Sequence, residues 1–252
     1  MAGVYDHPKY YEVAFSFRNI PQEVDVFEEC IRRYARVPVK TFLELACGNG
    51  PHLNELIHRN YRYIGLDLNE HMLEFTRRKI SNPNQATLSK GDLCRFTLKE
   101  SAEFAFIALG SLFAKNTADL IDHFRSVAGA ISPGGLYLLD WCVYFSSRYE
   151  VEEKWEIEQD EILVQTTVNG KIVDPVEQIY EEAITLEVTD NRPKSTYKGV
   201  DYKRIIYPQE FLLMVEHKTE FEFIGWWNNW NLGDPLPSPN PITRPIVLLR
   251  RR

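Results

Sequence analysis

The sequence predicts an α/β fold in which a mostly parallel sheet is covered by helices, joined to a separate antiparallel β region. Two patterns lead to this prediction. Short apolar segments alternate with amphipathic ones over residues 38–140, which is typical of βαβ units. Apolar and polar residues then alternate singly over about 154–206, which is typical of antiparallel strands. At 252 residues the chain has room for one large domain or two smaller ones.

Strand and helix signals alternate regularly up to residue 140. A helix over 21–36 begins with Pro21, which suits a first helical turn. Asn69 is placed to cap a helix over 70–80. The expected strands are 41–45, 61–67, 86–88, 104–109 and 136–140. The other expected helices are 51–60 and 117–131, and a turn is expected at 132–135.

A period of two replaces this rhythm in the second half. Asn169-Gly170 is a strong hairpin signal within the expected antiparallel sheet. A helix over 208–217 and strands over 221–227 and 246–249 complete the chain. The expected segments are an N-terminal aromatic segment and helix (1–37), an α/β core (38–153), an antiparallel insertion (154–206) and a return to the core sheet (207–252).

The composition excludes several classes of protein. Hydrophobic residues make up 44% and charged residues 26% of the chain, which excludes disordered and collagen-like proteins. The formal net charge of −7 argues against nonspecific binding to nucleic acid or to an anionic membrane. All five tryptophans follow residue 140, so the two halves of the chain are expected to have different tasks.

The cysteines and the N-terminus favour a reducing compartment. The cysteines are Cys30, Cys47, Cys94 and Cys142. They show no metal-ligand spacing, so we expect free thiols and no metal site. The first residues lack the basic and apolar regions of a signal peptide, and no run of about 18 apolar residues is present. We therefore expect a cytoplasmic protein with no membrane partner.

Glycines and acidic residues follow three successive predicted strands. In segment 44–50, Gly48 and Gly50 allow a sharp turn and the close approach of a ligand. Asp67 ends the next strand, where a carboxylate can accept hydrogen bonds from a ribose diol. Gly91-Asp92 follows the third. Each residue alone can serve as a turn former or a helix cap, but their ordered occurrence favours a ligand site at the carboxyl edge of the sheet.

These motifs, with Pro133-Gly134-Gly135 before a strand, resemble the class I S-adenosylmethionine-dependent methyltransferases over about residues 38–140. The resemblance implies a Rossmann-like seven-stranded sheet with helices on both faces and an antiparallel last strand, supplied by residues 246–249. It implies S-adenosyl-L-methionine as the cofactor and methyl transfer by in-line displacement, in which positioning contributes most. A general base is not always needed, because a neutral amine can attack directly.

The resemblance also implies which residues hold the cofactor. Glu44, Ala46, Gly48 and Gly50 would line the methionine part of the cofactor. Asp67 would hold the ribose hydroxyls, Leu68 and Met72 would pack on the adenine, and Leu109-Gly110-Ser111 would lie under the sulfonium. The full implied set is Glu44, Ala46, Gly48, Asn49, Gly50, Asp67, Leu68, Met72, Gly91, Asp92, Leu93, Leu109, Gly110 and Ser111. Ala46 departs from the family, which often has glycine there, and we expect the added methyl group to be tolerated.

A nicotinamide dehydrogenase fits the same segment less well. The third glycine of the dinucleotide fingerprint is replaced by Leu53. Glu44 would repel a diphosphate, whereas a cofactor with a sulfonium and an ammonium group tolerates a carboxylate.

The N-terminal segment is similar to the tyrosine-rich segment that folds over the cofactor in glycine and amino-sugar N-methyltransferases. Aromatic rings attract a sulfonium through cation–π interaction, and an arginine can pair with the cofactor carboxylate. We expect these roles for Tyr11 and Arg18, followed by Tyr5 and Tyr10. The alternative is that the aromatic residues only dock the segment on the core.

The acceptor side is predicted from the second half of the chain. Trp141 and Tyr144 directly follow the fifth strand and are expected to face the pocket. Trp227 and Asn229 belong to a segment rich in indoles and amides, which is either an acceptor-binding wall or a hairpin corner or dimer contact. His123 and His217 are expected on helix surfaces, and no catalytic residue is predicted.

The sequence therefore predicts methyl transfer to a nitrogen or oxygen of a small molecule by a monomer or homodimer. The alternatives are a non-catalytic S-adenosylmethionine-binding module and a protein methyltransferase. The acidic balance argues against RNA as a substrate. Leu109-Gly110-Ser111-Leu112 stands where methylases of bases and glutamine amides carry Asn/Asp-Pro-Pro-Tyr/Phe, which disfavours those reactions.

Overall fold

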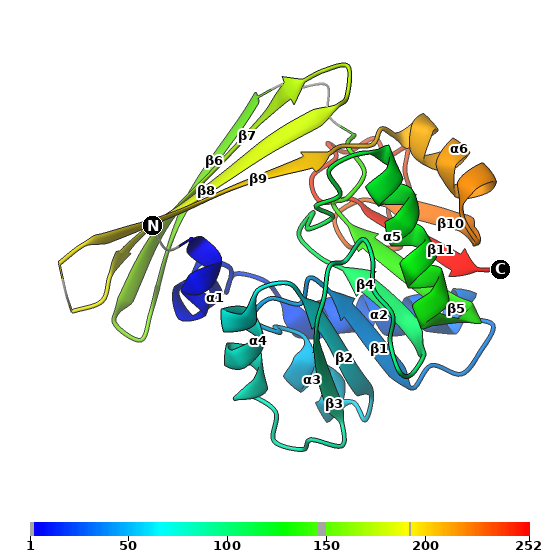
Figure 1. Cartoon of the computed structure of the whole chain (residues 1–252), viewed down its shortest axis with the longest axis horizontal. Coiled ribbons are helices and arrows are strands. Elements are labelled where there is room, and N and C mark those ends of the chain that lie inside the picture. Colours follow the sequence, from blue (N-terminus) through cyan, green and yellow to red (C-terminus); the bar gives the residue numbers. More distant parts are fainter. Residues whose placement is uncertain (1–2, 146–149, 192) are drawn as a thin grey trace.

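The computed structural model describes residues 3–145, 150–191 and 193–252, whose strands form two separate sheets (Figure 1). The seven-stranded sheet contains β1 (Thr41–Leu45), β2 (Arg62–Asp67), β3 (Ala86–Lys90), β4 (Ala102–Ile107), β5 (Ile131–Asp140), β10 (Phe221–Trp227) and β11 (Ile246–Arg251). The four-stranded sheet contains β6 (Glu150–Gln159), β7 (Ile162–Asp174), β8 (Ile179–Thr189) and β9 (Ser195–Arg204). The helices are α1 (Pro8–Ala14), α2 (Ile20–Tyr34), α3 (Leu53–His58), α4 (Glu70–Arg77), α5 (Thr117–Ala130) and α6 (Pro208–Lys218), after a 3₁₀ turn at Val4–Asp6.

The seven-stranded sheet has the order β10-β11-β5-β4-β1-β2-β3. Neighbours from β5 to β3 run parallel, whereas β11 runs antiparallel to both β5 and β10. This arrangement confirms the predicted fold class, including the antiparallel last strand. Because the parallel strands share a direction, the ends of β1, β2, β3 and β4 meet at one edge.

Helices cover both faces of this sheet, which explains why all five residues of β1 are buried. Leu43 and Leu45 pack into a cluster with α5 and α6. Phe42 points to the opposite face and packs against Phe27 of α2. The alternation of side chains along β1 therefore also places Glu44 on the α2 side.

The four-stranded sheet confirms the predicted antiparallel region and meets the N-terminal segment. Figure 1 shows α1 between this sheet and α4. The indole Nε1 of Trp155 in β6 donates to the carbonyl oxygen of Ala14 at 2.6 Å. A Cβ on Gly199 of β9 would lie 2.9 Å from Cγ2 of Val4. The absence of a side chain at Gly199 leaves room for the Val4 side chain to pack against β9.

The predicted hairpin turn at Asn169-Gly170 is wrong. Both residues lie inside β7, and the connection from β6 instead turns at Asp160-Glu161, which have φ values of 51° and 64°. Gly170 serves a different purpose, because a Cβ there would lie 1.6 Å from the hydroxyl oxygen of Tyr180 on β8. The glycine leaves room for this tyrosine to cross the strand.

The expected turn at 132–135 is wrong, and the structure adds one helix to those expected. Residues 132–135 lie within β5 as an irregularity, since Ile131 pairs with Ala102 but the next regular pair joins Leu136 to Phe104. Helix α1 was not predicted, because its seven residues are too few to show a helical period. Among the described residues, no helix is both long and apolar enough to cross a membrane.

Candidate cofactor-binding site

The loop after β1 has the backbone conformation that the glycine pattern predicts. Ala46, Gly48 and Gly50 have positive φ values of 50°, 52° and 60°. Thr76 of α4 holds the loop in place, since its Oγ1 donates to the carbonyl oxygen of Gly48 at 2.8 Å. Lys79 donates to the carbonyl oxygen of Asn49 at 2.7 Å. The loop is therefore fixed by the helix that follows β2.

Gly48 is the position where a ligand could approach the backbone. A Cβ built on Gly48 would meet nothing within 4 Å, so the space above it is open. Its amide nitrogen donates to Oδ2 of Asp67 at 2.7 Å, and the Asn69 amide donates to Oδ1 at 2.8 Å. A carboxylate offers about four lone-pair sites, so Asp67 keeps acceptor capacity for a ligand hydroxyl. Burial raises the pKa of Asp67.

The predicted adenine side lies at the ends of β2 and β3. Leu68 is 67% exposed although it is a large apolar residue, whereas Met72 is buried. The Asn69 side chain accepts from the Met72 amide at 3.1 Å, which confirms the predicted helix cap. The Gly91 amide donates to the carbonyl oxygen of Asp67 at 2.9 Å. Asp92 is exposed, and its Oδ1 accepts from the Cys94 amide at 2.8 Å.

The loop after β4 completes the edge. Leu109 and Gly110 have positive φ values of 53° and 65°. The Leu109 amide donates to Oδ2 of Asp140 at 2.8 Å, and the Gly110 amide donates to the Asp140 carbonyl at 2.9 Å. Trp141, directly after β5, is 44% exposed beside this loop. The positions that the resemblance assigns to ribose, adenine and sulfonium thus lie along one edge.

Glu44 does not face this edge, unlike the expectation for the methionine part of the cofactor. It is buried on the α2 side, where its Oε1 lies 2.7 Å from Nδ1 of His52 and its Oε2 accepts from the Tyr63 hydroxyl at 2.6 Å. Nε2 of His52 lies 2.9 Å from Oε2 of Glu23. Arg18 is bound to Glu23 as well, so this arginine also belongs to a buried polar network.

Charge pairing sets the protonation of this network. Burial alone lowers the pKa of His52, but the carboxylates of Glu44 and Glu23 outweigh it and the pKa is raised. Burial alone raises the pKa of Glu23, but hydrogen bonds from His52 and Arg18 outweigh it and the pKa lies well below its usual range. The network therefore favours a protonated imidazole between two carboxylates.

The N-terminal tyrosines divide into two groups. The rings of Tyr5 and Tyr11 lie 5.6 Å apart, and Tyr11 lies within electrostatic range of Asp67 and Arg18. Burial raises the pKa of both tyrosines, which keeps their hydroxyl groups protonated. Tyr10 instead donates to Asp190 at 2.5 Å, so it docks the segment on the four-stranded sheet.

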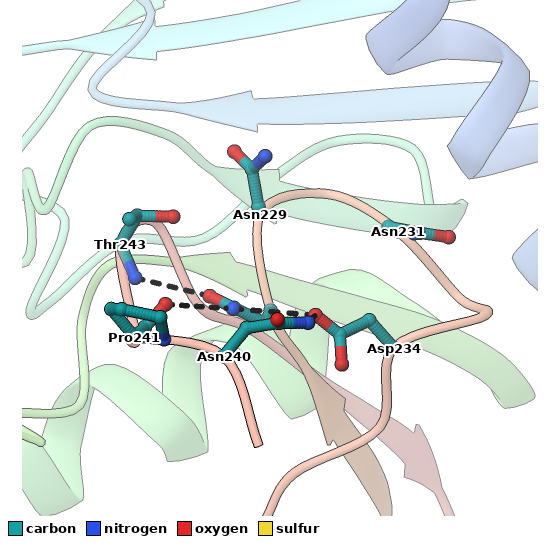
Figure 2. A pocket seen from close by; sticks show the side chains of 7 residues that line it. Asn229, Asn231, Asp234, Asn240, Pro241 and Thr243 are labelled. Carbon is teal, nitrogen blue, oxygen red and sulfur yellow. Dashed lines mark hydrogen bonds between the residues drawn. The ribbon is translucent and has the colours of Figure 1, made fainter. Parts of the chain in front are cut away.

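The structure does not bring the predicted acceptor residues together in one site. Trp227 is 6% exposed and packs against Tyr34, because its side chain lies on the face of the sheet that α2 covers. Asn229 lines a surface cavity of about 410 Å³, and Figure 2 shows its side chain turned away from the hydrogen bonds below it. Tyr144 packs against Tyr180 and Tyr207. Of this set, only Trp141 is exposed beside the candidate cofactor loop.

Sequence reasoning missed two buried polar centres. Asp140 accepts from Nε1 of Trp230 at 3.0 Å and pairs with Arg244. His123 was expected on a surface, but it is fully buried, with Nε2 2.7 Å from the Tyr137 hydroxyl. Burial lowers the pKa of His123 to about 4. Its sequence signal was available, since His123 falls on the same helix face as Leu120 and Phe124.

The segment that carries this edge matches a known domain family. Residues 42–135 match a family described as a methyltransferase domain. This match shows a methyltransferase domain over residues 42–135, and the sheet order is that of the class I S-adenosylmethionine-dependent methyltransferase fold. The resemblance seen in the motifs is confirmed.

Individual relatives point the same way. The chain is 31% identical over 109 residues to the putative methyltransferase YqeM of Bacillus subtilis (strain 168), covering 42% of this chain and 44% of that protein. It is 28% identical over 141 residues to the dTDP-3-amino-3,4,6-trideoxy-alpha-D-glucopyranose N,N-dimethyltransferase of Streptomyces venezuelae, covering 54% and 56%. The chain thus spans about half the length of these relatives. An S-adenosylmethionine-dependent methyltransferase from Clostridium acetobutylicum ATCC 824 has the same fold over 96% of both chains, with a TM-score of 0.77 and 16% identity.

Proposed function

We infer that the chain transfers a methyl group from S-adenosylmethionine to a nitrogen atom of a small molecule. The observation that carries this inference is the open space above Gly48, directly beside the Asp67 carboxylate at the edge of the sheet. A backbone that a ligand can approach and a carboxylate with free lone pairs are what a nucleoside with a ribose diol requires. The relative from Streptomyces venezuelae, named as an amino-sugar N,N-dimethyltransferase, supports nitrogen over oxygen.

In this proposal the chain contributes binding and orientation. Gly48 would receive the methionine part of the cofactor, Asp67 the ribose hydroxyls and the exposed Leu68 the adenine. When bound, S-adenosylmethionine supplies a methyl carbon that forms the new N–C bond while the C–S bond breaks and its electron pair stays on sulfur. Leu109-Gly110-Ser111 would lie beside the reacting atoms, fixed by the hydrogen bond of Leu109 to Asp140.

The setting is part of the proposal as well. A small-molecule acceptor, no nucleic-acid or membrane partner, and a monomer or homodimer in the cytoplasm fit the net charge of −7 and the four free cysteines. Three of these thiols are buried.

A methyl-transfer screen tests the activity directly. The full chain would be incubated with S-adenosylmethionine labelled on the methyl group and with separate pools of small amines, small alcohols and proteins. We expect labelled product in the amine pools. Transfer confined to the protein pools would favour a protein methyltransferase. Cofactor binding with no transfer in any pool would favour a binding module without catalysis.

A further inference from the structure

One group of polar side chains lies where the four-stranded sheet meets the candidate cofactor edge. We call it the tyrosine–carboxylate cluster, formed by Tyr5, Tyr11, Glu182, Asp201 and Lys203. Glu182 of β8 and Asp201 of β9 are direct cross-strand partners. The rings of Tyr5 and Tyr11 lie 5.6 Å apart, and the charges of Glu182 and Asp201 act on both hydroxyl groups.

The cluster adjoins the position expected under the sulfonium. Nζ of Lys203 donates to the carbonyl oxygen of Gly110 at 3.0 Å and to Oε2 of Glu182 at 2.9 Å. The charges of Asp67, Glu182 and Asp201 all act on the Tyr11 hydroxyl. An acceptor bound at the cluster would therefore lie between the four-stranded sheet and the end of β4.

The paired carboxylates are unfavourable unless a cation joins them. Like charges directly opposite each other on neighbouring strands destabilise a sheet. Lys203 hydrogen-bonds to Glu182, whereas the charges of Lys203 and Lys115 reach Asp201 only through space. Among the described residues, an ammonium is thus hydrogen-bonded to Glu182 but not to Asp201, which leaves the charges of the pair unbalanced at close range. The Lys203 and Glu182 side chains are only 12% and 19% exposed, so water screens this imbalance incompletely.

We propose that Tyr5, Glu182 and Asp201 form the acceptor subsite of this methyltransferase and bind an amine in its ammonium form, with Asp201 accepting one proton from it. The inference rests on the proposed methyl transfer and names its substrate class. Nζ of Lys203 holds the Glu182 carboxylate in place, and the neighbouring rings of Tyr5 and Tyr11 would supply an aromatic wall for the alkyl part of the amine.

The proposed step begins with an acceptor in its ammonium form and with Asp201 as a carboxylate. The carboxylate of Asp201 takes one proton from the ammonium nitrogen, which leaves a neutral amine with a free lone pair. That lone pair forms the bond to the methyl carbon, and the nitrogen becomes positively charged again. Burial raises the pKa of Asp201, as does the nearby charge of Glu182, while the Tyr5 hydroxyl and the charges of Lys203 and Lys115 act against the rise. A raised carboxyl pKa suits a proton acceptor at neutral pH.

The test separates acceptor binding from cofactor binding. The full chain saturated with S-adenosylhomocysteine would be titrated calorimetrically with glucosamine and a dTDP-linked amino sugar, and with the same sugars carrying a hydroxyl in place of the amine. We expect the amines to bind more tightly than their hydroxyl counterparts. Glu182→Gln and Asp201→Asn should weaken amine binding by about 10-fold or more, the effect of losing a hydrogen bond to a charged group. Both variants should keep their affinity for S-adenosylhomocysteine, which also reports that they fold.

Glu181→Gln is the matched control. Glu181 is the preceding residue of β8, points to the outer face and accepts from the Tyr202 hydroxyl at 2.8 Å. This variant should bind the amines as the unchanged chain does. Transfer rates add a second measure, because the defect of Asp201→Asn should shrink at about pH 9.5, where an amine with a pKa of about 8 is already largely neutral.

Three results would overturn the subsite. They are equal binding of amines and hydroxyl sugars, unchanged amine affinity in both carboxylate variants, and binding of no amine at all. If S-adenosylhomocysteine still binds in these cases, the acceptor assignment fails while the cofactor site stands. If S-adenosylhomocysteine does not bind to the unchanged chain, the proposed function fails with it.

Discussion

Ala46 has a backbone conformation that suits glycine better than alanine. Its φ of 50° lies in the left-handed region, where a Cβ costs roughly 1–2 kcal/mol. The residue turns the chain from β1 toward Gly48, so the loop retains this conformation despite the cost. A methyl group at this position is accommodated but strained.

Ala46→Gly should therefore stabilise the chain by about 1 kcal/mol, which raises the melting temperature of a chain of this size by roughly 2–4 °C. Ala128→Gly is the control, because Ala128 lies in α5 and should lose at least about 0.5–1 kcal/mol on the same substitution. Differential scanning calorimetry measures both. A fall in melting temperature for Ala46→Gly would contradict the strain assigned here.

The orientation of Glu44 could be predicted from the sequence, whereas its hydrogen-bond partners could not. The alternation of β1 is visible in the sequence and places Glu44 on the same face as the apolar Phe42. This alternation indicates that the carboxylate points into the core. Its partners could not be predicted, since Tyr63 comes from β2 and His52 precedes a helix that covers the same face.

At the scale of elements, the buried network of His52 joins α2 to β1. The pKa of His52 is raised above 6.5, so its contribution to stability is fully present below about pH 6.5 and is lost as pH rises through its folded-state pKa. The pKa of Glu23 is lowered from 4.5, so its contribution is present above that value and is lost as pH falls toward its folded-state pKa. The two windows overlap in the mildly acidic range.

Chemical denaturation at a series of pH values tests this coupling. The free-energy difference between the unchanged chain and His52→Gln should be largest in mildly acidic solution and should shrink as pH rises above neutral. His71→Gln is the control, since His71 is 63% exposed and should show little pH dependence. A difference for His52→Gln that stays constant with pH would contradict a protonated His52.

The wrong hairpin prediction at Gly170 has a physical reason outside the local sequence. The Asn-Gly pair is a typical turn signal, but here β7 continues through it, paired with β8. The glycine is needed because Tyr180 of β8 occupies the space that a side chain at position 170 would fill. A side chain from another strand cannot be read from local sequence. Helices α2, α4 and α5 were predicted within a few residues, because their caps and periods are local features.

Gly170→Ala should destabilise the chain by about 1–3 kcal/mol, the usual cost of overpacking, because the new methyl group meets the Tyr180 hydroxyl. Gly129→Ala is the matched change, since a Cβ at Gly129 in α5 meets nothing within 4 Å and should stabilise by about 0.5–1 kcal/mol. Urea unfolding distinguishes the two. Equal stability of Gly170→Ala and the unchanged chain would show that Tyr180 moves aside freely.

At the scale of the whole molecule, the meeting of the strand ends at one edge could be predicted, and the contacts of the four-stranded sheet with the rest of the chain could not. The residues of the edge follow strands in order, and parallel topology brings strand ends together. Those contacts join distant segments, such as Lys203 with Gly110 and Trp155 with Ala14. The tryptophans drew attention to the second half, yet Trp227 and Trp230 pack into the core.

The cofactor site is tested most directly by isothermal titration calorimetry with S-adenosylmethionine on the unchanged chain and on Asp67→Ala. Losing the carboxylate should weaken binding by about 1–3 kcal/mol, which corresponds to roughly 5- to 150-fold in affinity. Glu70→Ala is the control, because Glu70 begins α4 three residues later, is half exposed and should leave the affinity unchanged. A chain that binds no S-adenosylmethionine, or an Asp67→Ala variant that binds it as tightly as the unchanged chain, would contradict the cofactor site described here.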